Sequence, residues 1–155
     1  MIQRIQSLYL LLIFLICNLM FFGNPTYARF ENSQLLVKLG AVKTTTSTKA
    51  GGAQPISTLE PLNVVLVIAV GLGALVTVFL FRNTVRQRKI CIYLTLAAAA
   101  LLVLMVLRLF EVSGQSSGYP GLHLIWPIAC VVLGWMAWWG IRSDEKLLEG
   151  MDRIR

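Results

Sequence analysis

The chain has 155 residues, of which 57% are hydrophobic and 14% are charged, and its mean hydropathy is +0.73. Soluble domains carry about 25% charged residues, so this composition excludes an ordinary soluble monomer and indicates a membrane protein. The net charge of +7 predicts attraction to the anionic head groups of a lipid bilayer. It does not indicate nucleic-acid binding, because the basic residues are not interleaved with stacking aromatic residues on a soluble surface.

Four apolar runs hold most of the hydrophobic residues. They cover residues 8–22, 62–81, 90–110 and 122–141. A helix of about 20 residues crosses the hydrocarbon core of a bilayer and satisfies its own backbone polar groups, as lipid requires. The sequence therefore predicts an all-α membrane protein with four transmembrane helices in a single domain, residues 1–155. The predicted spans are about 5–23, 62–81, 90–110 and 122–141.

The first run is the shortest and allows an alternative interpretation. Arg4, the apolar run and the small-residue end Thr26-Tyr27-Ala28 follow one another in the order of a cleavable signal peptide. Cleavage there would leave a protein with three spans. Only Arg4 and the amino terminus provide positive charge before the run, and Tyr27 is an ordinary loop residue. A retained first helix is therefore the preferred prediction.

The distribution of Lys and Arg predicts how the chain crosses the membrane, because positive residues near the ends of spans resist translocation. The expected inner segments hold nine basic residues, namely Arg4, Arg82, Arg86, Arg88, Lys89, Arg142, Lys146, Arg153 and Arg155. The outer loop 24–61 holds only Arg29, Lys38, Lys43 and Lys49. We therefore expect both termini, the loop 82–89 and the tail 142–155 to be cytoplasmic.

The outer loop divides into two parts of different character. Residues 35–42 are apolar enough to pair as a short strand. Residues 44–53 are rich in Thr, Ala and Gly and too poor in large apolar groups to offset the entropy of ordering, so we expect a mobile stretch. Ser57 and Glu60 have the spacing of a capping box and Pro61 suits the first helical turn, which predicts a helix start here.

Clusters of reactive side chains are not evident in the sequence. Cys17, Cys91 and Cys130 fall in three different apolar runs and lack metal-binding or redox spacing, so they are interpreted as packing residues. The single histidine, His123, lies beside Trp126 and is interpreted as an interfacial polar residue rather than a metal ligand or proton relay. We predict no catalytic, cofactor-binding or metal-binding residue and no enzymatic activity.

Arg108 is the only charged residue inside the four apolar runs. An ionisable residue in a span is a functional hypothesis by default, but Arg108 lies near the end of its run. Its side chain can reach the head groups, and Glu111 three residues later offers a helical ion pair. We therefore favour an anchoring role over a transport pathway. Asn18, in the first run, is expected to form a hydrogen bond between helices.

Small residues predict where the helices pack closely. Ala69 and Gly73 form a small-xxx-small pair with Gly71 nearby, and residues 97–100 are four alanines on the third run. The second and third runs are joined by only eight residues, which predicts an antiparallel hairpin. These small-residue faces also offer a surface to a partner protein.

The tail has apolar residues at helical spacing, at Leu147, Leu148, Met151 and Ile154. This pattern predicts a cytoplasmic amphipathic helix. The helix can continue the last span, lie on the inner leaflet, dock on the basic loop or bind a partner helix, and the sequence leaves these four alternatives open. Docking on the basic loop would use the acidic residues Asp144, Glu145, Glu149 and Asp152.

Motifs at both ends and in the middle of the chain carry a family resemblance. They are Met1-Ile2-Gln3-Arg4-Ile5-Gln6 at the start, Arg82-Asn83 with Arg86-Gln87-Arg88 in the middle, and Ile141-Arg142-Ser143-Asp144-Glu145-Lys146-Leu147 with Asp152-Arg153-Ile154-Arg155 at the end. With these motifs the chain resembles a family of small bacterial membrane proteins with four predicted spans and unknown function. The resemblance implies an integral protein of the bacterial inner membrane whose first segment is retained, and it implies no activity.

Taken from the residues, the functional hypothesis is a membrane scaffold or interaction protein. The small packing residues and the scarcity of charge within the runs favour it. A small transporter or channel subunit is the alternative, although it would need a polar path that Arg108 and Asn18 alone hardly make. A membrane enzyme would need a cluster of His, Cys or carboxylate side chains at one interface.

Overall fold

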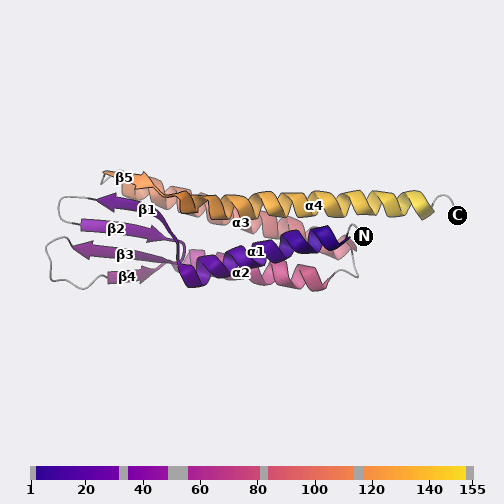
Figure 1. Cartoon of the computed structure of the whole chain (residues 1–155), viewed down its shortest axis with the longest axis horizontal. Helices are drawn as coiled ribbons and strands as arrows, with labels where there is room; N and C mark the ends of the chain where they lie inside the picture. Colours follow the sequence, from indigo (N-terminus) through magenta and orange to yellow (C-terminus); the bar gives the residue numbers. More distant parts are fainter. Residues whose placement is uncertain (1–2, 32–34, 49–55, 81–83, 114–116, 153–155) are drawn as a thin grey trace.

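The computed structural model describes residues 3–31, 35–48, 56–80, 84–113 and 117–152. The helices are α1 (Gln3–Gly23), α2 (Pro61–Phe79), α3 (Thr84–Ser113) and α4 (Ile125–Asp152), with a short 3-10 turn, η1 (Leu122–Leu124), before α4. The strands are β1 (Thr26–Glu31), β2 (Leu35–Gly40), β3 (Lys43–Thr48), β4 (Ile56–Leu59) and β5 (Ser117–Pro120). The helices lie side by side, the strands project from one end, and both termini lie at the other end (Figure 1).

The strands form one antiparallel sheet in the order β4-β3-β2-β1-β5. The prediction of an all-α protein was therefore wrong. The strand expected within residues 35–42 is confirmed as β2. The connection before α4 supplies β5, which pairs with β1 and so joins two segments that are far apart in the sequence.

The threonine-rich segment differs most from its prediction. Residues 44–48 belong to β3 rather than to a mobile stretch, and the rest of the predicted stretch, 49–53, lies outside the described residues. β3 pairs with β2 on one side and with β4 on the other. Thr44 lies opposite Leu39 of β2, and Thr46 lies opposite Ile56 of β4. Threonine is β-branched and favours extended backbone, and ladder hydrogen bonds on both sides offset the entropy of ordering.

Within the described residues, three helices are long and apolar enough to cross a membrane: Pro61–Phe79, Arg86–Ser113 and Leu122–Ser143. The apolar part of α1, Ser7–Gly23, is shorter, so the prediction of four transmembrane helices is corrected to three candidate spans. The helices nevertheless form a ring, in which α1 packs on α2 and α4, and α3 packs on the same two helices. The predicted hairpin of the second and third runs is confirmed by the packing of α2 on α3.

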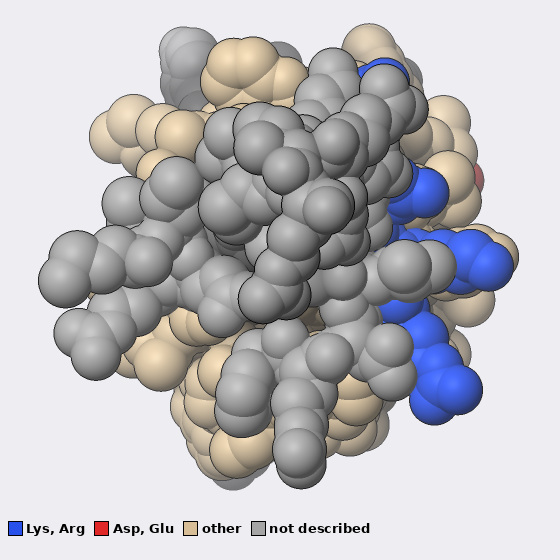
Figure 2. Space-filling model, turned by 90° about the vertical axis from the view of Figure 1, so that its right-hand side faces the viewer, with Lys and Arg blue, Asp and Glu red and all other residues tan. Residues whose placement is uncertain are grey.

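The basic residues expected in a connecting loop lie on a helix instead. Because α3 begins at Thr84, Arg86, Arg88 and Lys89 belong to its first two turns. In a view onto the end that carries the termini, basic side chains gather on one side (Figure 2). The tail continues the last span, which is one of the four alternatives left open by the sequence, because α4 runs without interruption to Asp152.

The start of α2 is only partly as predicted. Pro61 occupies the first turn, as expected from its fixed φ angle. Glu60 is the residue at the helix boundary, and it makes no side-chain capping hydrogen bond. The capping-box prediction was wrong because Ser57 pairs in the sheet, opposite Thr45.

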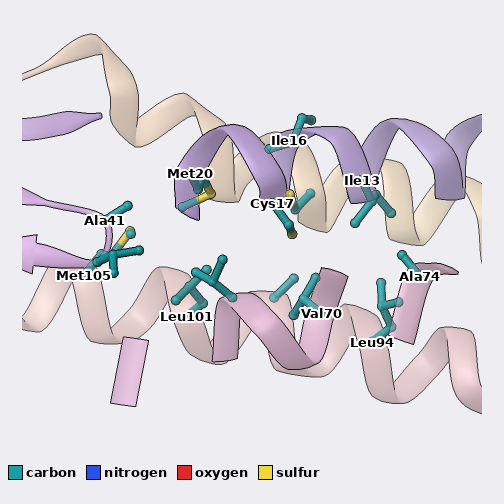
Figure 3. Close-up of a cluster of buried hydrophobic side chains, with 14 of the residues drawn as sticks. Ile13, Ile16, Cys17, Met20, Ala41, Val70, Ala74, Leu94, Leu101 and Met105 are labelled. Atoms are coloured by element: carbon teal, nitrogen blue, oxygen red, sulfur yellow. The ribbon is translucent and has the colours of Figure 1, made fainter. Parts of the chain in front are cut away.

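The buried core runs from the sheet into the helix bundle (Figure 3). Near the sheet, Ala41 lies beside Met105 of α3. Farther along, Cys17 of α1 faces Val70 of α2 and Leu101 of α3. These side chains are all buried, so the sheet end and the helices share one buried core.

Candidate functional site

Polar side chains gather where the sheet meets the helices, and this junction is the candidate site. Its main members are Asn24, Tyr27, Glu60, Arg108 and His123. They come from the end of α1, from β1, from the start of α2, from the end of α3 and from η1. Of these residues, only Arg108 and His123 were considered for functional roles from the sequence, and Glu60 was expected only to cap a helix.

Asn24 ties the end of α1 to the turn between β2 and β3. Its Oδ1 accepts hydrogen bonds from the backbone N–H of Val42 (2.9 Å) and of Lys43 (3.0 Å), and its Nδ2 donates to the Lys43 carbonyl (3.2 Å). Its φ of 39° lies in the left-handed region, which asparagine adopts more easily than most residues. Gly40 lies against the same amide group. The sequence signal was an Asn-Pro pair just after an apolar run, which is typical of a turn.

Arg108 links two helices to the sheet. Its Nη1 lies 3.1 Å from Oε2 of Glu111, which confirms the predicted helical ion pair, and its Nη2 lies 3.2 Å from Oε2 of Glu60. The Glu60 side chain is only 20% exposed, whereas that of Arg108 is 51% exposed. Glu60 also accepts a hydrogen bond from Thr44 Oγ1 (3.3 Å), and its backbone N–H donates to the Val42 carbonyl (3.0 Å). The contacts of Glu60 with Arg108 and Thr44 were not predicted from the sequence, because they depend on the sheet.

Tyr27 is the buried phenol of the junction, with 2% of its surface exposed. Burial raises the pKa of Tyr27 to about 12, and the nearby negative charge of Glu60 adds to this rise while Arg108 opposes it. The phenol therefore stays protonated at neutral pH. Its folded-state pKa is raised, so its contribution to stability is complete below pH 10 and is lost as the pH rises toward about 12.

His123 lies at the exposed edge of the junction. Its Nδ1 is 3.1 Å from the carbonyl oxygen of Thr26, and its ring stacks on Trp126 with centroids 6.4 Å apart. The backbone N–H of Gly121 donates to the Tyr27 carbonyl (2.6 Å), which holds η1 against β1. This placement agrees with an interfacial polar residue. Within the described ranges, three or more His, Cys, Asp or Glu side chains nowhere gather closely enough to hold a metal ion.

Asn18 does not form the predicted hydrogen bond between helices. Its Nδ2 donates to the Phe14 carbonyl of its own helix (2.9 Å), because that acceptor lies one turn away and needs no close partner helix. The side chain lines a groove of about 290 Å³ between α1 and α2. Cys17 borders the same groove, and a Cβ on Gly71 would lie 3.2 Å from the Cβ of Cys17.

The small residues and the cysteines serve close packing, with different partners from those expected. Gly71 faces α1, Gly73 faces Leu94 of α3, and Ala69 is exposed, so the predicted pair is not one contact face. Cys17, Cys91 and Cys130 are buried thiols. The Sγ atom of Cys91 lies 3.5 Å from the carbonyl oxygen of Gly134 on α4. Gly134, where α3 and α4 approach each other closely, was not predicted from the sequence.

The chemistry of the junction is that of a structural link. The charge of Arg108 is offset by two carboxylates, the phenol of Tyr27 is neutral, and the Asn24 amide makes three hydrogen bonds to backbone groups. Such an arrangement fixes the position of the sheet relative to the ends of α2 and α3. It does not place a nucleophile next to a base among the described side chains.

Comparison with known proteins places the chain in a family. No curated protein matches it. The family model described as Domain of unknown function (DUF4293) matches residues 2–154, which is nearly the whole chain. This match confirms the family resemblance of the terminal motifs. The chain therefore belongs to the DUF4293 family, whose function is unknown.

Proposed function

We propose that the protein is an integral membrane protein of the interaction or scaffold type, without catalytic activity. Its helices hold a five-stranded sheet at one face of the membrane, and this sheet is the docking surface for a partner protein. The three long apolar helices support the membrane placement. The junction supports the rest, because its ion pairs and hydrogen bonds fix the sheet to the bundle.

The proposed membrane is the bacterial inner membrane, with the basic end of the bundle on the cytoplasmic side. Arg86, Lys89 and Arg142 are exposed near the end that carries both termini. Among the acidic side chains that the structure describes, Glu31, Glu60 and Glu111 all lie at the sheet end. Positive residues stay on the cytoplasmic side, so the sheet faces outward.

The observation that carries the proposed role is the edge strand β4. Its only neighbour among the described strands is β3, so one row of its backbone groups lacks a sheet partner there. Ile56 and Leu59 are 68% and 61% exposed, although both are large and apolar. An apolar edge strand is a template on which an extended segment of another protein adds a strand. We propose this mode of docking.

Charged residues on the edge strand test this role. The double variant Ile56→Lys/Leu59→Lys should lose its co-purifying partner by about tenfold or more, because two apolar anchors are replaced by charges that blunt edge pairing. The measurement is quantitative mass spectrometry of proteins that co-purify with the tagged full chain in mild detergent. Leu35→Lys is the matched control, because it adds a charge to β2, away from the edge. The same partner at the same level with the double variant would contradict the proposal.

A further inference from the structure

A second groove, of about 420 Å³, lies between α3 and α4. Ile92, Leu96 and Ala99 line it from α3, and Val131, Trp135 and Trp138 line it from α4. The polar side-chain groups in this lining are the hydroxyl of Thr95 and the two indole N–H groups. Thr95 Oγ1 already donates to the Cys91 carbonyl (2.8 Å), so the wall is apolar along most of its length.

Packing on either side explains why the groove is open. A Cβ on Gly134 would lie 2.7 Å from Thr95 Oγ1, so the two helices approach closely at this level. The small side chain of Ala99 leaves space beside this contact, and the tilted rings of Trp135 and Trp138, with centroids 5.3 Å apart, form the opposite wall. The result is a groove with an apolar lining that can accept an apolar ligand.

Trp138, which lines the groove, carries a hydrogen-bond donor that is not used. Its indole Nε1 is buried, and it has no hydrogen-bond partner in the part of the chain that the structure describes. A buried donor without an acceptor is costly, and tryptophan normally pairs its N–H group at the boundary between lipid and water. A ligand oxygen that reaches this N–H group would satisfy it.

Positive charge flanks the same end of the groove. The guanidinium of Arg142 lies 5.6 Å from the centre of a Trp138 ring, one turn farther along α4. Lys89 precedes Ile92 by one turn on α3 and is exposed. The basic side chains visible together in Figure 2 belong to this end of the molecule. The groove is therefore apolar at depth and positively charged at its mouth.

We propose that the groove binds one anionic phospholipid of the surrounding membrane. An acyl chain packs against Leu96 and Ala99, a glycerol ester oxygen accepts the hydrogen bond from Trp138, and the phosphate lies beside Arg142 and Lys89. Interfacial tryptophan and flanking basic residues are the groups that proteins use for this recognition. The inference rests on the membrane placement proposed above, and it adds a specific site.

A second copy of the chain fits the groove less well. In a symmetric dimer the same surface patch meets itself, so the contact would bring Arg142 and Lys89 close to their own copies. Like charges at an interface oppose such pairing. An anionic head group instead complements both residues at once.

Native mass spectrometry of the purified full chain, with phosphatidylglycerol or phosphatidylcholine added to the detergent, tests the site. Wild type should retain one phosphatidylglycerol in clear preference to phosphatidylcholine. Arg142→Gln should reduce this retention about fivefold, because one basic contact at the membrane surface is lost. Trp138→Phe keeps the ring but removes the N–H, and it should reduce retention about threefold.

Two controls match these variants. Arg29→Gln removes one positive charge at the sheet end, and Trp139→Phe removes an indole N–H from an exposed ring outside the groove lining. Both should retain phosphatidylglycerol as wild type does. Equal retention of the two lipids by wild type, unchanged retention by Arg142→Gln, or a dimer in place of the lipid would overturn the proposal. These results differ from those expected if the membrane placement itself is wrong. In that case, the wild-type protein would be missing from the membrane fraction of cells.

Discussion

Replacing Gly40 by alanine should destabilise the fold by about 3 kcal/mol, since overpacking and broken hydrogen bonds act together. An added Cβ would collide with the Lys43 carbonyl and would lie 2.5 Å from Oδ1 of Asn24. Neither atom can yield easily, because the first belongs to the backbone and the second accepts two backbone hydrogen bonds. The substitution therefore breaks the connection between α1 and the sheet.

Thermal unfolding of the purified chain, followed by circular dichroism in detergent, measures this effect. Gly23→Ala is the matched control, because nothing lies within 4 Å of the position that its Cβ would take. This control should unfold at the wild-type temperature or slightly above it, since alanine favours the helix. Equal stability of Gly40→Ala and Gly23→Ala would contradict the described junction.

Gly134→Ala should weaken the packing of α3 on α4, and Thr95→Ala should restore it. The added Cβ would lie 2.7 Å from Thr95 Oγ1, and Thr95 is a stiff β-branched residue whose hydroxyl is engaged with Cys91. We expect a loss of about 1–3 kcal/mol, the usual effect of overpacking. Removal of the hydroxyl and methyl groups in the double variant opens the space that the new methyl group needs.

A double-mutant cycle on thermal unfolding shows whether the two positions are coupled, because residues in contact depart from additivity. Gly73→Ala serves as the control, since its Cβ would lie 3.5 Å from Leu94 Cδ1, which is ordinary contact. It should have little effect. Additive effects of Gly134→Ala and Thr95→Ala would show that the helices do not meet at this level.

The helices were largely predictable from the sequence, whereas the sheet was not. Apolar runs of span length have few other structures open to them, so α2, α3 and α4 follow from composition. The strands depend on distant partners. β5 contains one glycine and one proline in four residues, a composition typical of a turn, and it becomes a strand because β1 lies beside it. The polar threonines of β3 did not predict a strand from the sequence. The strand is stabilised by pairing with β2 and β4.

The same distinction applies to the candidate site. The pair of Arg108 and Glu111 was predictable because both residues lie on one helix, three positions apart. The second carboxylate, Glu60, comes from another helix and reaches Arg108 only when the bundle has formed. Asn24 was also missed, because its role depends on the turn between β2 and β3.

Labelling of single introduced cysteines tests most directly whether the sheet and the basic end of the bundle lie on opposite faces of the membrane. Ser57→Cys places a thiol on β4, and Ser143→Cys places one near the basic end; both serines are exposed and differ little from cysteine in size. The natural cysteines are buried, so the wild-type chain reports the background. With a membrane-impermeant maleimide added to spheroplasts, Ser57→Cys should react at once and Ser143→Cys only after the membrane is permeabilised. Reaction of both cysteines from the same side would contradict the account.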